Sequence, residues 1–278
     1  MTPVLERVRK SNFVRRFDKT PSEVRCPHFY ELILSNGCPY DCAYCYLKLT
    51  FRGKTSPTLF TNEWTEVLSE LKQSGPGVYN TGELADSLAV CPPLLESALD
   101  YFSNCCSKYL LLVTKSDNIS LLQDREPSTQ VIVSFSVNSD QAAKVYEKGA
   151  PSPRQRLRAA CALKKQGWRV RVRIDPVIPH TGLDGYRGLC EQVAELGPER
   201  VTVGTLRQYP GVHNFSKTAP RRGLQLSPDG RLRYPEQVRI DTYQQFSDWL
   251  GFKPALCKET YILWRKLGWR FMGCNCTP

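Results

Sequence analysis

The chain has 278 residues, of which 41% are hydrophobic, so it is long enough to bury the core of one large domain, which we predict, or of two small ones. Its 38 Lys and Arg residues outnumber its 27 Asp and Glu residues, and the net charge of +11 favours a polyanionic partner such as DNA or RNA over the alternative of a merely soluble basic protein. The start MTPVLERVRK predicts no signal peptide and no run approaches the ~18 apolar residues of a membrane span, so we expect a cytoplasmic chain whose 12 cysteines are reduced or bound to metal.

Strands and helices are predicted to alternate along most of the chain. Residues 1–25 are basic and are expected to form a loosely held arm. Residues 29–35 (FYELILS) predict the first strand, and further strands are predicted at 78–80, 109–113, 131–137, 168–174 and 201–206. Capping and stop residues predict helices at 61–75, 94–106, near 118, 140–148, 153–166 and 184–196. This alternation predicts an α/β fold with parallel strands and right-handed crossovers.

Polar residues follow the carboxyl ends of the predicted strands. If the sheet curls as barrels do, these residues gather at one mouth. They are Cys38, Cys42, Cys45, Glu83, Lys115, Ser136, Asn138, Asp175 and Arg207. The alternative, that strand ends are polar because they leave the core, accounts for part of this set.

The most informative stretch is the loop CPYDCAYCY at residues 38–46. Its C-x3-C-x2-C spacing, preceded by Gly37, lets Cys38, Cys42 and Cys45 hold three corners of an iron-sulfur cube, leaving one iron open. S-adenosylmethionine (SAM) suits such an iron, so the loop predicts radical chemistry. The alternatives are a structural zinc completed by Cys26 or His28, or buried thiols that bind nothing.

The chain resembles radical SAM enzymes and, among them, the spore photoproduct lyase family. The resemblance lies in CPYDCAYCYL, NTGELADSL at 80–88, VTK at 113–115, SFSVN at 134–138 and EKGAPSPRQRLRAACALKKQGWRVRVRIDPVIP at 147–179. It implies a partial (β/α)6 TIM-type barrel of the radical SAM type at residues 26–215, after the basic arm at 1–25. Residues 216–278 are expected to form a helical, cysteine-containing C-terminal extension.

The resemblance also implies site roles. Cys38, Cys42 and Cys45 would bind a 4Fe-4S cluster, and a second set of residues would contact SAM. The SAM set is Gly82, Glu83, Lys115, Ser136 and Asn138. Tyr44 and Tyr46 would lie near the substrate and relay a radical. The implied activity is generation of a 5′-deoxyadenosyl radical that abstracts hydrogen from nucleic acid, in DNA photoproduct repair or a related base modification, with an electron donor such as flavodoxin or ferredoxin.

Two departures from the family pattern keep other functions open. Glu83 stands where the family has a hydrogen-donating cysteine, and Cys91 is the nearest alternative donor. Cys257, expected at a helix start, with Cys274 and Cys276, is predicted as a second cluster, a zinc site, or thiols without metal. The alternative functions are a radical SAM enzyme that modifies a protein or small molecule, and a zinc-stabilised nucleic-acid-binding module.

Overall fold

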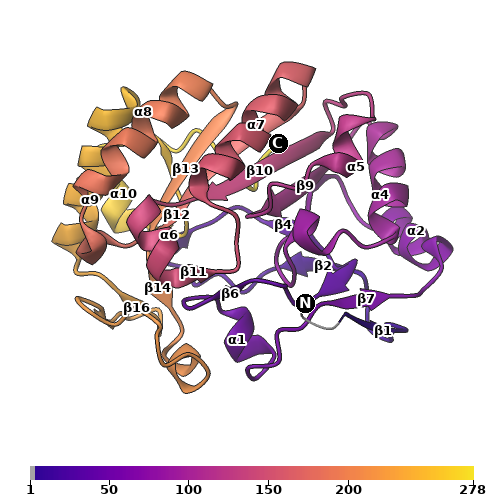
Figure 1. Ribbon diagram of the computed structural model, residues 1–278, viewed down its shortest axis with the longest axis horizontal. Coiled ribbons are helices and arrows are strands. Elements are labelled where there is room, and N and C mark those ends of the chain that lie inside the picture. The colour runs from indigo at the N-terminus through magenta and orange to yellow at the C-terminus, as the bar shows by residue number, and fades with distance from the viewer. Residues whose placement is uncertain (1–3) are drawn as a thin grey trace.

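The computed structural model describes residues 4–278 and is built on an open eight-stranded sheet (Figure 1). The strand order is β17 (Ala255–Leu256), β13 (Arg200–Thr205), β12 (Arg169–Val177), β10 (Val131–Val137), β9 (Lys108–Thr114), β8 (Gly77–Asn80), β4 (Phe29–Leu32) and β2 (Val14–Phe17). The strands from β17 to β4 are parallel, and β2 is antiparallel to β4. The predicted α/β fold with a partial barrel is therefore confirmed, with β4, β8, β9, β10, β12 and β13 as its six strands.

Helices cover the outer face of this sheet (Figure 1). They are α2 (Trp64–Gln73), α4 (Leu94–Ser103), α5 (Ser120–Gln123), α7 (Pro153–Gln166), α8 (Arg187–Leu196) and α9 (Glu236–Leu250). Because side chains alternate along a strand, Leu110 and Leu112 of β9 enter the core under the helices, whereas Leu111 packs on the inner face with Phe29 and Ile132. The outer core carries most of the buried apolar surface, which leaves the inner face free for polar side chains.

Shorter elements complete the connections. The short helices are α1 (Leu47–Thr50), α3 (Ser87–Val90), α6 (Asp140–Tyr146) and α10 (Tyr261–Lys266), with 3-10 turns at Pro179–Thr181, Asp184–Tyr186 and Pro210–Asn214. The short strand groups are β1 (Leu5–Arg7), β7 (Thr58–Phe60) and β5 (Ser35–Asn36); β6 (Asp41–Cys42) and β11 (Glu147–Lys148); and β14 (Arg207–Gln208), β16 (Leu232–Arg233) and β15 (Gln225–Leu226). A last pair joins β3 (Val24–Arg25) to β18 (Glu259–Thr260).

The N-terminal segment differs from the loosely held arm that the sequence predicts. Within its described part, β2 extends the main sheet, with Val14 opposite Leu32, and β1 pairs in parallel with β7. Phe13 is 2% exposed and belongs to the main core. The basic composition of this segment did not predict its packing, because only single apolar residues such as Phe13 hold it against the core.

The C-terminal region also differs in part from the predicted helical extension. It contains α9 and α10, but β17 continues the parallel sheet beyond β13, and the last residues return to the inner face beside β10 (Figure 1). Ser134 of β10 donates a hydrogen bond to Asn275 at 2.6 Å, and Arg171 of β12 donates to the backbone oxygen of Asn275 at 2.8 Å. No helix among the described residues is long and apolar enough to cross a membrane.

Candidate active site

The cysteine loop is held by close backbone contacts. Gly37 has a φ of +78°, and a Cβ there would lie 2.3 Å from the backbone oxygen of Ser56, so a side chain does not fit. The amide of Cys38 donates a hydrogen bond to the backbone oxygen of Thr55 at 2.8 Å. Residues 55–56 therefore form a support on which the first cysteine of the loop is fixed.

The second half of the loop is fastened to β11 and α7. Cys42 in β6 lies opposite Glu147 in β11, and the Tyr44 phenol donates a hydrogen bond to the Glu147 carboxylate. Arg156 of α7 places a guanidinium nitrogen 2.6 Å from Glu147 Oε2, and the two side chains are 0% and 1% exposed. Sequence reasoning missed this pair. The capping residues that begin α7 predict the helix but not which of its arginines turns inward.

The charges around Glu147 set the protonation states of Glu147 and Tyr44. Burial would raise the pKa of Glu147, but Lys115 and Arg156, with the hydrogen bond from Tyr44, hold it below its ordinary value. Burial, followed by the neighbouring Glu147, raises the pKa of the Tyr44 phenol well above its ordinary value. Lys115 Nζ lies 5.8 Å from the centre of the Tyr44 ring, a cation–π contact. At neutral pH a carboxylate therefore accepts from a neutral phenol.

The turn after β8 meets the cysteine loop at Tyr46. A Cβ on Gly82 would lie 2.6 Å from the Cβ of Val113, so the turn passes too close to β9 for a side chain. Asn80 accepts from the Gly82 amide at 2.8 Å and donates to Glu83 Oε1 at 2.9 Å. The Tyr46 phenol donates to the backbone oxygen of Glu83 and lies 3.4 Å from Glu83 Oε2. The structure thus brings Tyr46 and Glu83 together.

Asp86 links the ends of β8 and β9, and sequence reasoning did not single it out. Its carboxylate accepts from Thr114 Oγ1 at 2.5 Å and from the Lys115 amide at 2.6 Å. It also caps α3 by accepting from the amides of Leu88 and Ala89. An Asp before a short apolar run is an N-cap signal that could have found it. Asp86 orients the backbone from which Lys115 extends.

Ser136 lies near the end of β10 and Asn138 directly follows the strand, and the two residues are 4% and 0% exposed. The Asn138 amide donates to Glu147 at 3.2 Å and accepts from the Tyr186 phenol at 2.6 Å. The backbone oxygen of Ser136 accepts from Arg156 at 3.0 Å. Asn138 therefore braces Glu147, and the contacts of both residues with a cofactor stay predictions.

The thiols of the loop can serve as ligands only after losing protons. Burial raises the pKa of Cys38 and of Cys45 and raises that of Cys42 to about 12. Metal binding would therefore release protons from all three. The exposed carboxylate in the loop, Asp41, is ion-paired with Lys48 and does not add a fourth ligand.

The two residues considered as a fourth zinc ligand lie away from this loop. Cys26 packs on the inner face beside Cys276, and the His28 ring lies 3.5 Å from the backbone oxygen of Phe17. Across residues 4–278, no three Cys, His, Asp or Glu side chains are close enough together to hold a single metal ion. The donor set of the loop is three thiols, which fits a 4Fe-4S cluster with an open iron.

Cys257 occupies a different position from the helix start that was expected. It follows β17, and its amide donates to the backbone oxygen of Val203 at 2.9 Å, so it lies at the carboxyl end of a seventh parallel strand. Arg207 and Arg173 donate to its sulfur at 3.0 and 3.6 Å, and both pair with Asp175 at 2.9 and 2.6 Å. The sequence could not predict this because a two-residue strand has no periodicity.

Within residues 4–278, Cys274 and Cys276 do not lie close enough to Cys257 to hold a single metal ion with it. Cys274 is buried, its backbone oxygen accepts from Arg200 at 2.7 Å, and its side chain contacts that of Cys276, which packs on the inner face beside Cys26. Cys91 directly follows α3 with a φ of 46° and packs against the outer core, where its charged neighbour is Glu96 of α4. The structure therefore does not bring Cys91 to the mouth.

A three-cysteine loop at the carboxyl end of the first parallel strand of a partial barrel defines the radical SAM class of protein. The family model for spore photoproduct lyase matches residues 14–249, and the chain belongs to that family. It is 26% identical over 219 residues to a spore photoproduct lyase of Bacillus subtilis, covering 76% of this chain and 64% of the relative. For a relative from Geobacillus the identity is 25% over 218 residues, with the same coverage of 76% and 64%. The chain thus spans slightly less than two thirds of these relatives.

Solved structures show the same fold. A spore photoproduct lyase complexed with dinucleoside spore photoproduct superposes with a TM-score of 0.72 at 19% identity, covering 91% of this chain and 81% of that one. A variant of the lyase with bound AdoMet and dinucleoside spore photoproduct gives the same TM-score and coverage, also at 19% identity. Streptococcus suis SuiB bound to the precursor peptide SuiA gives a TM-score of 0.55 at 14% identity, covering 84% and 48%.

Proposed function

We propose that the chain is a radical SAM enzyme that binds a 4Fe-4S cluster through Cys38, Cys42 and Cys45. The observation that carries this proposal is the meeting of the cysteine loop with the end of β8, where Tyr46 contacts Glu83. Ends of parallel strands are where barrel folds assemble reactive groups from distant parts of the chain. One buried and two partly buried thiols, a cation and two phenols within one such region suit binding of a cluster and an amino-acid-bearing cofactor.

The cluster and SAM supply, when bound, the radical that abstracts a hydrogen atom from substrate carbon. The chain supplies position. Lys115 is suited to pair with the SAM carboxylate, and Gly82 and Glu83 to receive its amino group. Although Tyr46 is 38% exposed as a whole, enclosure of its hydroxyl and the neighbouring Glu83 raise the pKa of the phenol, so its hydrogen stays on oxygen at neutral pH, as a hydrogen-atom relay requires.

For the substrate we propose nucleic acid that carries spore photoproduct or a related lesion. Two findings support this: the similarity to proteins named spore photoproduct lyase, and the net charge of +11, which favours a polyanion. A lesion acted on by an enzyme must leave the base stack to reach a barrel mouth. Cytoplasmic location, DNA repair and the use of a flavodoxin or ferredoxin belong to the same proposal.

A second candidate is a radical SAM enzyme that acts on a peptide. Glu83 favours it, because a carboxylate is no practical hydrogen-atom donor where the family resemblance leads us to expect a cysteine. The similarity of the fold to a protein bound to a precursor peptide agrees with this candidate. It predicts weak binding to DNA with little dependence on salt.

The test is anaerobic reconstitution with iron and sulfide, followed by SAM, reductant and DNA that contains spore photoproduct. Thymine and 5′-deoxyadenosine are measured in one reaction. Thymine release supports lesion repair. Deoxyadenosine without thymine supports radical chemistry on another substrate. If protein that holds iron and sulfide forms neither thymine nor deoxyadenosine, that result contradicts the proposal.

A further inference from the structure

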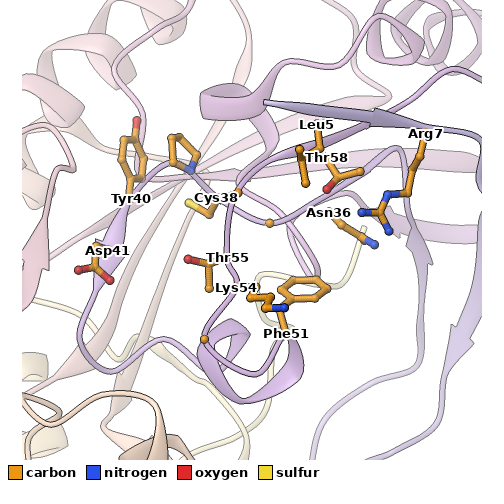
Figure 2. A pocket seen from close by; sticks show the side chains of 14 residues that line it. Leu5, Arg7, Asn36, Cys38, Tyr40, Asp41, Phe51, Lys54, Thr55 and Thr58 are labelled. Carbon is orange, nitrogen blue, oxygen red and sulfur yellow. The ribbon is translucent and has the colours of Figure 1, made fainter. Parts of the chain in front are cut away.

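A cleft of about 570 Å³ lies against the outer side of the cysteine loop (Figure 2). One wall is formed by residues 36–41, which include the first part of the cysteine loop, and the other is formed by β1 and β7. Residues 51 and 53–56, after α1, form the remaining side. Figure 2 shows Cys38 in the same cleft as Arg7 and Lys54. A cluster ligand therefore forms part of the wall of an open surface feature.

The residues predicted to contact SAM do not line this cleft. Tyr44 and Tyr46 of the loop contact Glu147 and Glu83, which do not line the cleft. Cys38, in contrast, is bonded through its amide to residue 55, which does line it. A molecule seated in the cleft would therefore lie against Cys38 without contacting Gly82, Glu83 or Lys115.

The cleft carries an excess of positive charge. Arg7 and Lys54 line it and are exposed, and within residues 4–278 neither makes an ion pair. The acidic lining residue, Asp41, is ion-paired with Lys48. Glu6 does not line the cleft because alternate residues of β1 face opposite sides, whereas Leu5, 44% exposed, does and adds apolar surface.

We propose that this cleft docks a small acidic one-electron carrier protein, which reduces the cluster held by the loop. The inference rests on the proposed function, since only a cluster-dependent enzyme needs the electron. In this step one electron passes from the carrier to the cluster, the carrier is oxidised by one electron, and no bond forms or breaks. A basic rim with some apolar surface suits a weak, electrostatically steered complex of this kind.

The test compares two reductants with one variant. The double variant carries Arg7→Glu and Lys54→Glu. Reconstituted protein is mixed anaerobically with either reduced flavodoxin or dithionite. The rate at which the cluster's visible absorbance is lost is then measured in the absence of SAM and substrate. We expect the rate with flavodoxin to fall about tenfold or more at low salt, because charge reversal removes steering, and the rate with dithionite to change less than about threefold. The matched control is Arg158→Glu with Lys165→Glu, two exposed residues of α7, with both rates near wild type.

A measurement on the wild-type protein tests the proposal even if the double variant misfolds. Raising NaCl from about 20 to about 200 mM should slow flavodoxin-driven bleaching several-fold, and Lys54→Gln alone should weaken this salt dependence. The proposal is overturned if the double variant is bleached by flavodoxin at the wild-type rate. It is also overturned if the α7 control loses as much of its flavodoxin rate as the double variant does. If the variant instead loses DNA binding with normal bleaching, the cleft binds nucleic acid. If dithionite bleaches nothing in the wild type, the proposed function fails first, and the docking proposal fails with it.

Discussion

Glu147 and Arg156 form an ion pair of 2.6 Å whose side chains are 1% and 0% exposed, and this pair connects the cysteine loop to α7. Glu147 reaches the loop twice, through the antiparallel pairing of β11 with β6 and through the hydrogen bond from Tyr44. A charge so deeply buried is stable only while its partner is present. The pair therefore couples packing of the helix layer to the geometry of the site.

Arg156→Met should destabilise the cluster-free protein by about 3–5 kcal/mol, because it leaves the Glu147 carboxylate buried without its partner. The measurement is urea unfolding under reducing conditions. Arg187→Met is the matched control: Arg187 pairs with Glu191, but the two side chains are 68% and 61% exposed, so we expect a change below about 1 kcal/mol. Equal effects of the two substitutions would show that the buried pair has no special role.

Gly37→Ala should cost about 4 kcal/mol or more and prevent cluster assembly, since its Cβ would lie 2.3 Å from the backbone oxygen of Ser56 at a φ of +78°. Gly230→Ala is the control, with a φ of +73° and no atom within 4 Å, and it should cost only about 1–2 kcal/mol. Unfolding free energies and iron content after reconstitution distinguish the two. A normal iron content in Gly37→Ala would contradict the close contact as a requirement for the loop.

Local signals predicted some elements closely and could not predict others. Helix 153–166 has the predicted bounds because Ser152 and Gln155 form a capping box and Gly167 ends the helix at a φ of +102°. Strand 131–137 also has its predicted bounds because it is an apolar run. Strand β17 and the return of Asn275 to the inner face depend on contacts across long stretches of sequence. No local pattern encodes such contacts.

The same difference applies to the site. The cysteine spacing and the strand ends predicted that the loop, Glu83 and Lys115 belong together, because parallel strands share one mouth. The Glu147–Arg156 pair was missed because its partners, nine positions apart, meet only after β11 turns back onto β6. Cys257 was misplaced for a similar reason: Pro254 suggested a helix start, whereas the segment joins the sheet.

Glu199 should make stability depend on pH through the arginines that hold the C-terminal residues. Burial would raise its pKa, but hydrogen bonds from Arg171 and Arg169 lower it to about 2, from an ordinary value of 4.5. A depressed pKa stabilises the folded state above about pH 4.5, and this contribution disappears as the pH falls toward 2. Glu199→Gln should cost about 2 kcal/mol at pH 7, allowing for the 31% exposure of the carboxylate, and the cost should shrink below pH 4.5. A cost that is the same at pH 7 and pH 3 would contradict this, and Glu191→Gln serves as the exposed control.

Iron content should distinguish the cysteine loop from the C-terminal cysteines. Cys42→Ser should reduce bound iron from roughly four per chain to near zero, because a cluster held by three thiolates does not survive loss of a ligand. The triple variant of Cys257, Cys274 and Cys276 to Ser should keep roughly four, because the sulfur of Cys257 is already occupied by hydrogen bonds from Arg207 and Arg173. A drop of several irons in the triple variant, with the cluster absorbance of the loop intact, would show a second cluster and overturn this prediction. Zinc without iron in the wild type would instead point to the zinc-stabilised alternative.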